Sequence, residues 1–384
     1  MPIAEARSRA TVVGARRSLM PALGTWGFIV TFSGQSLRNV VGWWAFGVIA
    51  AISGIMLLVV FVREGHRVQW RALPAPACAY TILCMASVIW SYYPRETVLA
   101  GLLMLATTAT GVLLACGLSL RQFTDALSRA LEATLVLSFL LELYVALILR
   151  EPLIPIYMKD WKEVPPSYIW VEGNIFKGGP IQGIVGNRNP LAFIALLTLI
   201  CVVVRWRDYR LRLPNFLIWS ALSILTLVLT GSATVIVAAI VCGIVMLFMW
   251  LLRHVPVALR TTVIVAASTL GVAAVSLAIG WHSQLIALLG RSPDMSGRWE
   301  IWLKVIDLWE QHTFLGWGWI MYWVPWIPMF GTLVIPPDGT PTLSAHNAYI
   351  EALFQTGVVG AAMIVVLVLT LLIRSFQLAV RYLD

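Results

Sequence analysis

The sequence predicts an all-α, polytopic membrane protein, and three observations lead to this fold class. The chain of 384 residues is 60% hydrophobic and only 12% charged, whereas about a quarter of the residues in a soluble domain are charged. Its apolar residues form runs of roughly the 20 residues that an α-helix needs to cross the hydrocarbon core of a bilayer. The 18 tryptophans fit the same class, because indole rings collect at bilayer interfaces.

Ten apolar runs are candidates for transmembrane helices. The first and the seventh are short, and a tight turn at residues 230–232 separates the seventh from the eighth. We therefore expect about ten spans, at residues 19–35, 41–62, 75–91, 98–119, 128–149, 189–205, 214–230, 232–252, 260–280 and 347–373.

The placement of the basic residues predicts the orientation of these spans. Most of the 27 lysines and arginines lie in the N-terminal segment and in the short connections that follow every second span. Such residues are retained on the cytoplasmic side, so both ends of the chain are predicted to lie there. These connections also account for the net charge of +9, and no nucleic-acid partner is expected.

Two connections are much longer than the others and are predicted to be extracytoplasmic. They are rich in tryptophan, tyrosine and proline, so we expect them to be ordered and functional. They divide the chain into an N-terminal bundle of five spans (1–149), a first long loop (150–188), spans six to nine (189–280), a second long loop (281–346), and a last span with a cytoplasmic tail (347–384).

The second long loop is predicted to contain an amphipathic helix at residues 298–312. Glu300 and Lys304 are spaced to form an i,i+4 ion pair on its wet side. A helix of this kind lies along the bilayer surface. The apolar stripe that predicts it has the spacing i, i+3, i+4, i+7 and consists of Trp302, Val305, Ile306 and Trp309, extended by Trp299.

The motif Ser-Ala-His-Asn at residues 344–347 stands at the outer mouth of the last span. Ser344 is expected to cap a helix that begins near His346, and the first turn of a helix carries a partial positive charge. That field favours the neutral imidazole, which can accept a proton. Glu351, one turn after Asn347, is placed to orient a neighbouring group. A histidine with only a structural role is the alternative interpretation.

Two further motifs bring arginines to the same predicted side. In Gly-Asn-Arg-Asn-Pro, Asn189 is expected to cap a helix whose first residue is Pro190, with Arg188 just outside it. A helix N-terminus beside an arginine can bind an anion. The second motif supplies Arg298, preceded by Arg291 in the same loop. The alternative for Arg188 is attachment to lipid phosphate, and for Arg298 it is a helix-start cap or a lipid anchor.

The fifth span contains Glu142, and a carboxylate within a span is a candidate for function. No metal site is expected, because the other histidines show no ligand spacing. The five cysteines lie in apolar runs without a Cys-x-x-Cys pair, so neither a zinc site nor a disulfide framework is expected.

The motifs between residues 186 and 372 resemble those of one family. They comprise a Gly-Arg-x-x-x-Trp helix, a Leu-Gly-x-Gly turn, a His-Asn-x-x-Ile-Glu segment entering a span, the Gly-Asn-Arg-Asn-Pro element and the small-polar turn Thr-Gly-Ser-Ala-Thr. In this order they are similar to the O-antigen ligase and polysaccharide polymerase superfamily, and closest to its exopolysaccharide polymerase-like branch.

The resemblance implies an inverting glycosyltransferase that uses no metal or other cofactor. Such enzymes move a glycan from an undecaprenyl-pyrophosphate carrier to a hydroxyl of a glycan, lipid or protein acceptor, on the extracytoplasmic face of the bacterial cytoplasmic membrane. His346 would be the catalytic base and Arg298 would hold the leaving pyrophosphate. The remaining candidates for binding the pyrophosphate or glycan are Arg188, Asn189, Arg291, Trp302, Asn347, Glu351 and Glu142.

Two features depart from the family pattern. Ala233 stands in the small-polar turn where many members carry a basic residue, and the chain ends soon after the tenth span. The expected function is therefore a polysaccharide polymerase or ligase, and the motifs do not distinguish between the two. A flippase or other transporter of lipid-linked glycans, and a non-catalytic scaffold of an assembly complex, are the alternatives. A transporter needs a polar path through the midplane and paired broken spans, which the sequence does not indicate.

Overall fold

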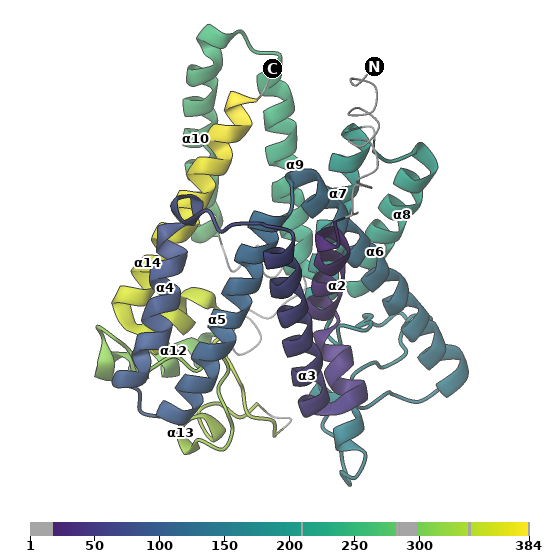
Figure 1. Cartoon of the computed structure of the whole chain (residues 1–384), viewed down its shortest axis with the longest axis vertical. Coiled ribbons are helices and arrows are strands. Elements are labelled where there is room, and N and C mark those ends of the chain that lie inside the picture. Colours follow the sequence, from purple (N-terminus) through teal and green to yellow (C-terminus); the bar gives the residue numbers. More distant parts are fainter. Residues whose placement is uncertain (1–17, 209, 282–283, 285–297, 337–338, 383–384) are drawn as a thin grey trace, which may run out of the picture.

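A computed structural model describes residues 18–208, 210–281, 284, 298–336 and 339–382. Helices dominate this part of the chain (Figure 1), and within it no strand forms beyond an isolated antiparallel bridge between Leu153 and Val171. The fold is an all-α polytopic membrane protein, as predicted.

Each of the ten predicted apolar runs forms a helix. Eight of the described helices are long and apolar enough to cross a membrane, and the apolar helices Met20–Phe32 and Ala75–Ile89 are shorter. Of the two runs expected to be short, the first forms a short helix. The seventh does not, since its helix Leu213–Thr230 has the 18 residues needed to cross a membrane. The third run also forms a short helix, which was not expected. Prolines at the start of the third helix, and a 3₁₀ turn at its end, limit its length. The number of spans stays a prediction.

The helices keep the order of the sequence. Their bounds are α2 (Met20–Phe32), α3 (Gly34–Arg63), α4 (Ala75–Ala86), α5 (Pro94–Gly117), α6 (Leu120–Tyr144), α7 (Arg188–Arg207), α8 (Leu213–Thr230), α9 (Ala233–Arg253), α10 (Val257–Gly280), α12 (Arg298–Trp309), α13 (Pro328–Gly331) and α14 (Ala348–Arg381). A 3₁₀ turn follows α4 (Ser87–Ile89) and α12 (Glu310–His312), and a π-helical turn follows α6 (Val145–Leu149).

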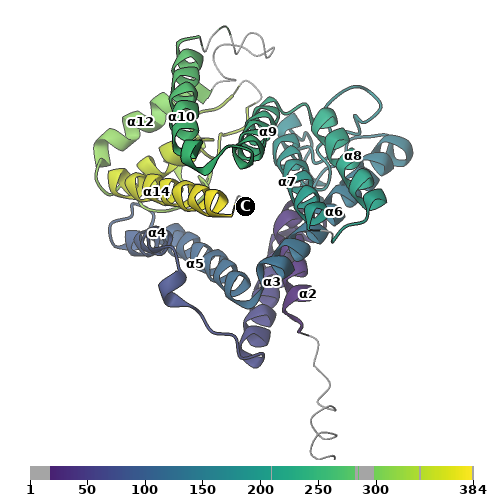
Figure 2. The same ribbon diagram turned by 90° about the horizontal axis from the view of Figure 1, so that it is seen from above.

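The helices form two groups (Figure 2). In one group α6 packs against α2 and α7, and α7 packs against α8; in the other α4 packs against α5 and α14, and α12 packs against α14. Contacts of α3 and α2 with α5 join the groups. The described parts of the two long loops lie at one end of the bundle, opposite the C-terminal end of α14 (Figure 1). We call this the loop end. Which side of a membrane it faces stays a prediction.

Two helices are broken at glycines near the loop end. In α3 the break is at Gly42 (φ 81°, ψ 172°), and in α14 it is at Gly357 (φ 67°, ψ −168°). Glycine adopts such positive φ angles without a steric penalty. A pair of helices broken at glycines was not predicted from the sequence. However, residues 43–63 and 358–381 remain long enough to cross a bilayer, so neither break needs to lie at the midplane, where transporters place theirs.

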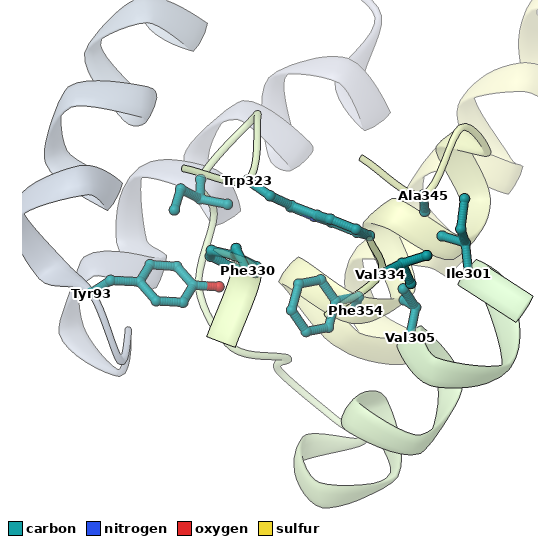
Figure 3. Close-up of a cluster of buried hydrophobic side chains, with 9 residues drawn as sticks. Tyr93, Ile301, Val305, Trp323, Phe330, Val334, Ala345 and Phe354 are labelled. Atoms are coloured by element: carbon teal, nitrogen blue, oxygen red, sulfur yellow. The ribbon is translucent and has the colours of Figure 1, made fainter. Parts of the chain in front are cut away.

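The described part of the second long loop has its own hydrophobic core. Figure 3 shows Trp323, Phe330 and Phe354 gathered between Tyr93 on one side and the α12 residues Ile301 and Val305 on the other. The ring centroids of Trp323 and Phe330 are 5.9 Å apart in a stacked arrangement, and Phe354 meets both rings edge-on. This core fixes α12 against the start of α14.

The predicted helix at residues 298–312 is present, but its buried stripe differs from the prediction. Ile301 and Val305 are buried, whereas Trp299 is 57% exposed. The reason is that α12 packs against α14 and the core of the loop, so protein contacts determine which side of the helix is covered. The pair Glu300–Lys304 forms at 2.9 Å. The position of α12 on a bilayer surface stays a prediction.

Candidate active site

The start of α14 is built differently from the expectation. Asn347, not Ser344, is the N-cap: its Oδ1 accepts hydrogen bonds from the backbone N–H groups of Tyr349 (3.0 Å) and Ile350 (3.4 Å). The Oγ of Ser344 instead lies 3.4 Å from Nδ1 of His346. His346 therefore precedes the helix, at a left-handed backbone position (φ 51°). Histidine occurs there more often than most residues.

Ala345, the residue before His346, is held by hydrogen bonds at both its backbone N–H and its carbonyl. The backbone N–H of Ala345 donates to Oε2 of Glu351 (2.7 Å), and its carbonyl accepts from Nε1 of Trp302 (2.9 Å). Ala345 itself is fully buried. A left-handed conformation costs roughly 1–2 kcal/mol for a residue with a Cβ, and these two bonds hold the chain in it. We call Trp302, Ala345 and Glu351 the Ala345 clamp.

The carboxylate of Glu351 is part of a larger network. Its Oε1 accepts hydrogen bonds from Nε1 of Trp323 (2.6 Å) and Nε2 of Gln355 (2.5 Å). Gln355 is fully buried, and its Oε1 accepts from the backbone N–H groups of Ile320 and Met321. Because both oxygens of Glu351 are engaged by protein donors, the geometry favours a positioning role over direct contact with a substrate.

The Leu-Gly-x-Gly turn completes the break in α14. The backbone N–H groups of Trp317 and Gly318 donate to the carbonyls of Phe354 (3.1 Å) and Gln355 (2.9 Å), which the break leaves without helical partners. A Cβ on Gly316 would lie 2.5 Å from the backbone of Gln355, so only glycine allows this approach. The turn thus anchors residues 348–356, the half-helix that follows His346.

Arg298 is brought close to His346. It begins the described part of α12, one turn before Trp302 of the clamp, and it is half-buried. In the described residues it has no ion pair or hydrogen bond. Partial burial, followed by the positive charge of Arg298, lowers the pKa of His346 below its usual value of 6.5. The imidazole is exposed enough to meet a substrate. The lowered pKa favours its neutral form, and its causes are burial and Arg298 rather than the helix N-terminus expected from the sequence.

Arg188 occupies a different position from the predicted one. The N-cap of α7 is Asn187, whose side chain accepts from the N–H of Asn189 (2.9 Å), so Arg188 is the first residue of the helix. Oδ1 of Asn189 accepts from the buried Ser232 hydroxyl (2.8 Å), which ties α7 to the small-polar turn before α9. No described hydrogen bond or ion pair joins Arg188 to Arg298 or His346, so a pocket containing all three is a proposal.

Glu142 contacts the first long loop. It is fully buried in α6, and its Oε1 accepts from the backbone N–H groups of Gln182 (2.7 Å) and Gly183 (2.8 Å). The hydroxyl of Ser138, one turn earlier, accepts from the N–H of Ile184 (3.2 Å). These bonds fix the segment that leads to Arg188. The contacts of Glu142 are thus with the first long loop and not with α12 or α14.

Arg291, another of the predicted binding residues, lies outside the described residues. Within the part that the structure describes, no group of three or more His, Cys, Asp or Glu side chains could hold a metal ion, and independence of metal stays a prediction. A cavity of about 530 Å³ is lined by Gln69, Trp70, Arg71 and Ala72. It lies in the connection between α3 and α4 and includes none of the candidate residues.

Two residues of the site, Trp323 and Gln355, were not predicted from the sequence. Both donate hydrogen bonds to Glu351. For Gln355 a signal existed, because Asn347, Glu351 and Gln355 follow each other at intervals of four residues in an apolar segment. Polar residues at this spacing lie on one face of a helix. Trp323 was visible only as one of many tryptophans in the loop.

Replacing Trp302 with phenylalanine tests the Ala345 clamp. Phenylalanine keeps an aromatic ring but removes the donor to the Ala345 carbonyl, a bond worth about 1 kcal/mol. We expect a folded protein whose glycan transfer is about tenfold slower at unchanged affinity for the carrier, because small displacements of a catalytic group have large effects on rate. Trp299→Phe, on the exposed side of the same helix, is the control. Equal rates for both variants would contradict the clamp.

Comparison with known families gives one match. Residues 218–365 match the family model described as O-Antigen ligase, and neither curated proteins nor solved structures gave a match. The matched segment contains α12, the Leu-Gly-x-Gly turn, the Ala345 clamp and His346; Arg188 and the first six predicted spans lie outside it. The family supports a role in membrane glycan ligation or polymerisation. The resemblance found in the motifs is therefore confirmed for residues 218–365, the segment that is similar to the O-antigen ligase and polysaccharide polymerase superfamily.

Proposed function

We propose that this protein is an inverting glycosyltransferase that moves a glycan from an undecaprenyl-pyrophosphate carrier to an acceptor hydroxyl. The proposal places its active site at the loop end, on the extracytoplasmic face of the bacterial cytoplasmic membrane. The observation that carries it is the accessible, neutral imidazole of His346, fixed by the Ala345 clamp beside Arg298. The family match to residues 218–365 supports the same class of reaction.

The chemistry follows from the two side chains. His346 accepts the proton of the acceptor hydroxyl while the oxygen attacks the anomeric carbon. The bond between this carbon and the pyrophosphate oxygen breaks on the opposite face, which inverts the anomeric centre. A positioned base contributes about 10²–10⁴-fold to such a step. The carrier leaves as a diphosphate, which needs compensation of its negative charge rather than a proton.

The arginines supply that compensation in the proposed mechanism. Arg298 pairs with the leaving diphosphate through the two-pronged hydrogen bonds that a guanidinium forms with phosphate oxygens. Arg188, at the start of α7, is proposed as a second partner of the same group, and Arg291 as a third. Asn347 fixes the helix that follows His346, while Asn189 fixes the start of α7 through Ser232. With guanidinium groups as the counter-charge, we expect transfer to continue in the presence of EDTA.

The rate of glycan transfer should fall only below pH 6.5, the usual pKa of histidine. The base is neutral histidine, and partial burial and Arg298 lower the pKa of His346 below 6.5. Transfer should therefore be constant above pH 6.5 and decline below it. The lowered pKa also means that the unfolded chain binds this proton more readily, so folding stability declines in the same direction. Thermal unfolding at each pH separates the two effects, and an acid limb centred above pH 6.5 contradicts the assignment.

Reconstitution with a defined substrate tests the function. The purified protein is placed in proteoliposomes with an undecaprenyl-pyrophosphate-linked glycan and a candidate acceptor, and the products are separated by length. A ladder of products indicates a polymerase, and a single addition to a different acceptor indicates a ligase. Movement of intact carrier between the leaflets, without new glycosidic bonds, would instead indicate the transporter. If neither occurs with any acceptor offered, the enzyme assignment is wrong.

A further inference from the structure

Buried polar atoms without partners gather where α2 meets α3. In the described part of the chain, seven buried side-chain nitrogen or oxygen atoms lack a hydrogen-bond partner, and three of them lie within seven residues: Oγ of Ser33, Nε of Arg38 and Nδ2 of Asn39. Ser33 is 5% exposed and Asn39 is 1% exposed. Folded proteins satisfy nearly all buried polar groups with protein, water or ligand partners, so three such atoms within seven residues are grounds for seeking a ligand.

The surrounding side chains hold this cluster in a fixed geometry. The guanidinium of Arg38 lies 4.4 Å from the ring centroid of Trp43, and its Nη2 donates to Oε1 of Gln35. On the other side, the hydroxyl of Tyr157 donates to Oδ1 of Asn39 (3.4 Å). The side chains that carry these free donors are thus held by their neighbours, Arg38 through Gln35 and Trp43 and Asn39 through Tyr157. Such a site is pre-organised for binding.

The cluster lies beside the segment that leads to Arg188. Gln35 packs on Gly186, where an added Cβ would lie 3.1 Å from Cγ of Gln35 and 3.0 Å from Cδ1 of Trp170. Gly186 precedes Arg188 by two residues, and the helical residues 34–41 end at the break at Gly42. The cluster thus belongs to the loop end and is connected to the first long loop through Tyr157 and Gly186.

The chemistry of the three atoms selects the class of ligand. The orphan atoms of Arg38 and Asn39 can only donate hydrogen bonds, and the Ser33 hydroxyl can donate as well. Arg38 adds a permanent positive charge, and no acidic side chain forms an ion pair with it in the described residues. Each of these donors can pair with a negatively charged acceptor oxygen, and a phosphate carries several of them.

The neighbouring surface indicates where the phosphate comes from. Val40, next to Asn39, is 55% exposed, and Trp44, just beyond the break at Gly42, is 91% exposed. Exposed apolar side chains beside a fixed arginine suit a lipid, with its chain along the helix and its head group at the donors. We propose that Ser33, Arg38 and Asn39 form an anion site that binds the phosphate of a membrane lipid. Because the carrier is one such lipid, this inference deepens the proposed function without depending on glycan transfer.

Lipid binding to the purified full-length protein tests the site. Native mass spectrometry in a neutral detergent is used to titrate two probes, phosphatidylglycerol and undecaprenyl diphosphate. A charge-assisted hydrogen bond corresponds to about a tenfold to hundredfold change in affinity, so Arg38→Gln should weaken binding of at least one probe by tenfold or more. Asn39→Asp, which keeps the shape of the side chain but repels an anion, should do the same. Arg95→Gln is the control, since Arg95 is an exposed arginine at the start of α5.

The pattern of the results identifies the source of the phosphate. Weaker binding of both probes indicates a general phosphate site, and weaker binding of one probe assigns the site to that lipid. Unchanged affinity for both probes in Arg38→Gln and Asn39→Asp overturns the proposal. A photoactivatable phosphatidylglycerol and a photoactivatable undecaprenyl diphosphate, used with the wild-type protein, give a readout independent of variant folding. Labelling by either probe of the peptide with residues 33–44 supports the site, and its absence with both overturns it.

The outcome is separable from that of the proposed function. A protein without transferase activity can still bind lipid at Arg38, and a His346 variant should bind both probes as the wild type does. Conversely, active transfer with unchanged lipid affinity in the Arg38 variant would leave the enzyme assignment intact and remove only this site.

Discussion

Replacing His346 with asparagine lowers the rate of glycan transfer by about 10²–10⁴-fold, the usual contribution of a general base. Asparagine is chosen because, like histidine, it tolerates the left-handed conformation at φ 51°, so the Ala345 clamp can persist. The amide cannot accept the proton of the acceptor hydroxyl. Rates are measured with saturating carrier. Carrier affinity should stay within about twofold of the wild type, because the proposed base acts on the acceptor hydroxyl during the reaction and does not bind the carrier.

The control for this variant is His312→Ala. His312 lies in the same loop and packs against Tyr92 and Trp317, with ring centroids 4.6 Å and 4.5 Å away. Its loss changes aromatic packing but removes no proposed catalytic group. Full activity of His346→Asn, or equal losses in the two variants, refutes His346 as the base.

Replacing Arg298 with glutamine lowers transfer by about 10²–10³-fold, the typical effect of removing one donor that stabilises charge in a transition state. The same change has a second consequence for His346. Without the positive charge, the imidazolium becomes less unfavourable, so the pKa of His346 rises and the acid limb of the pH profile moves to higher pH. A defect limited to folding does not produce this shift.

Two further variants make the Arg298 test specific. Arg298→Lys keeps the charge but loses the fork of donors, so its rate should fall between those of the wild type and the glutamine variant, with little movement of the acid limb. Lys304→Gln removes a cation from the same helix that pairs with Glu300 on its solvent-facing side, and its rate should not change. An Arg298→Gln enzyme with an unaltered pH profile contradicts the proximity of Arg298 and His346.

The helices were predictable because each follows from a local property of the chain. An apolar run of about 20 residues has few alternatives to a helix in a membrane protein, and the positions of the ten runs agree with the structure. The Glu300–Lys304 pair and the helix that carries it were predictable for the same reason, since i,i+4 spacing is a property of one helix.

The helix starts were less predictable because each motif contains several residues that can cap. Ser344, Asn347, Asn187 and Asn189 all have suitable side chains. The structure uses Asn347 and Asn187, and the alternatives make other contacts: Ser344 lies against His346, and Asn189 accepts from Ser232 on another helix. Tertiary partners decide between equivalent caps, and a single sequence does not contain them.

The candidate site was predictable in its residues but not in its construction. His346 and Arg298 were selected from their motifs, and the structure brings them together. The fully buried Ala345 could not be recognised, because its importance lies in its backbone and in two partners, Trp302 and Glu351, from different helices. The break at Gly357 was missed for a similar reason, since it depends on a turn 40 residues earlier in the chain.

The break at Gly357 constrains how a lipid substrate can enter. The turn at residues 313–318 satisfies backbone groups that would otherwise be left unpaired in an apolar environment. These bonds couple the turn to both sides of the break in α14. A lipid path that separated the half-helix from the turn would leave these backbone groups unpaired, so such a path is expected to avoid this contact.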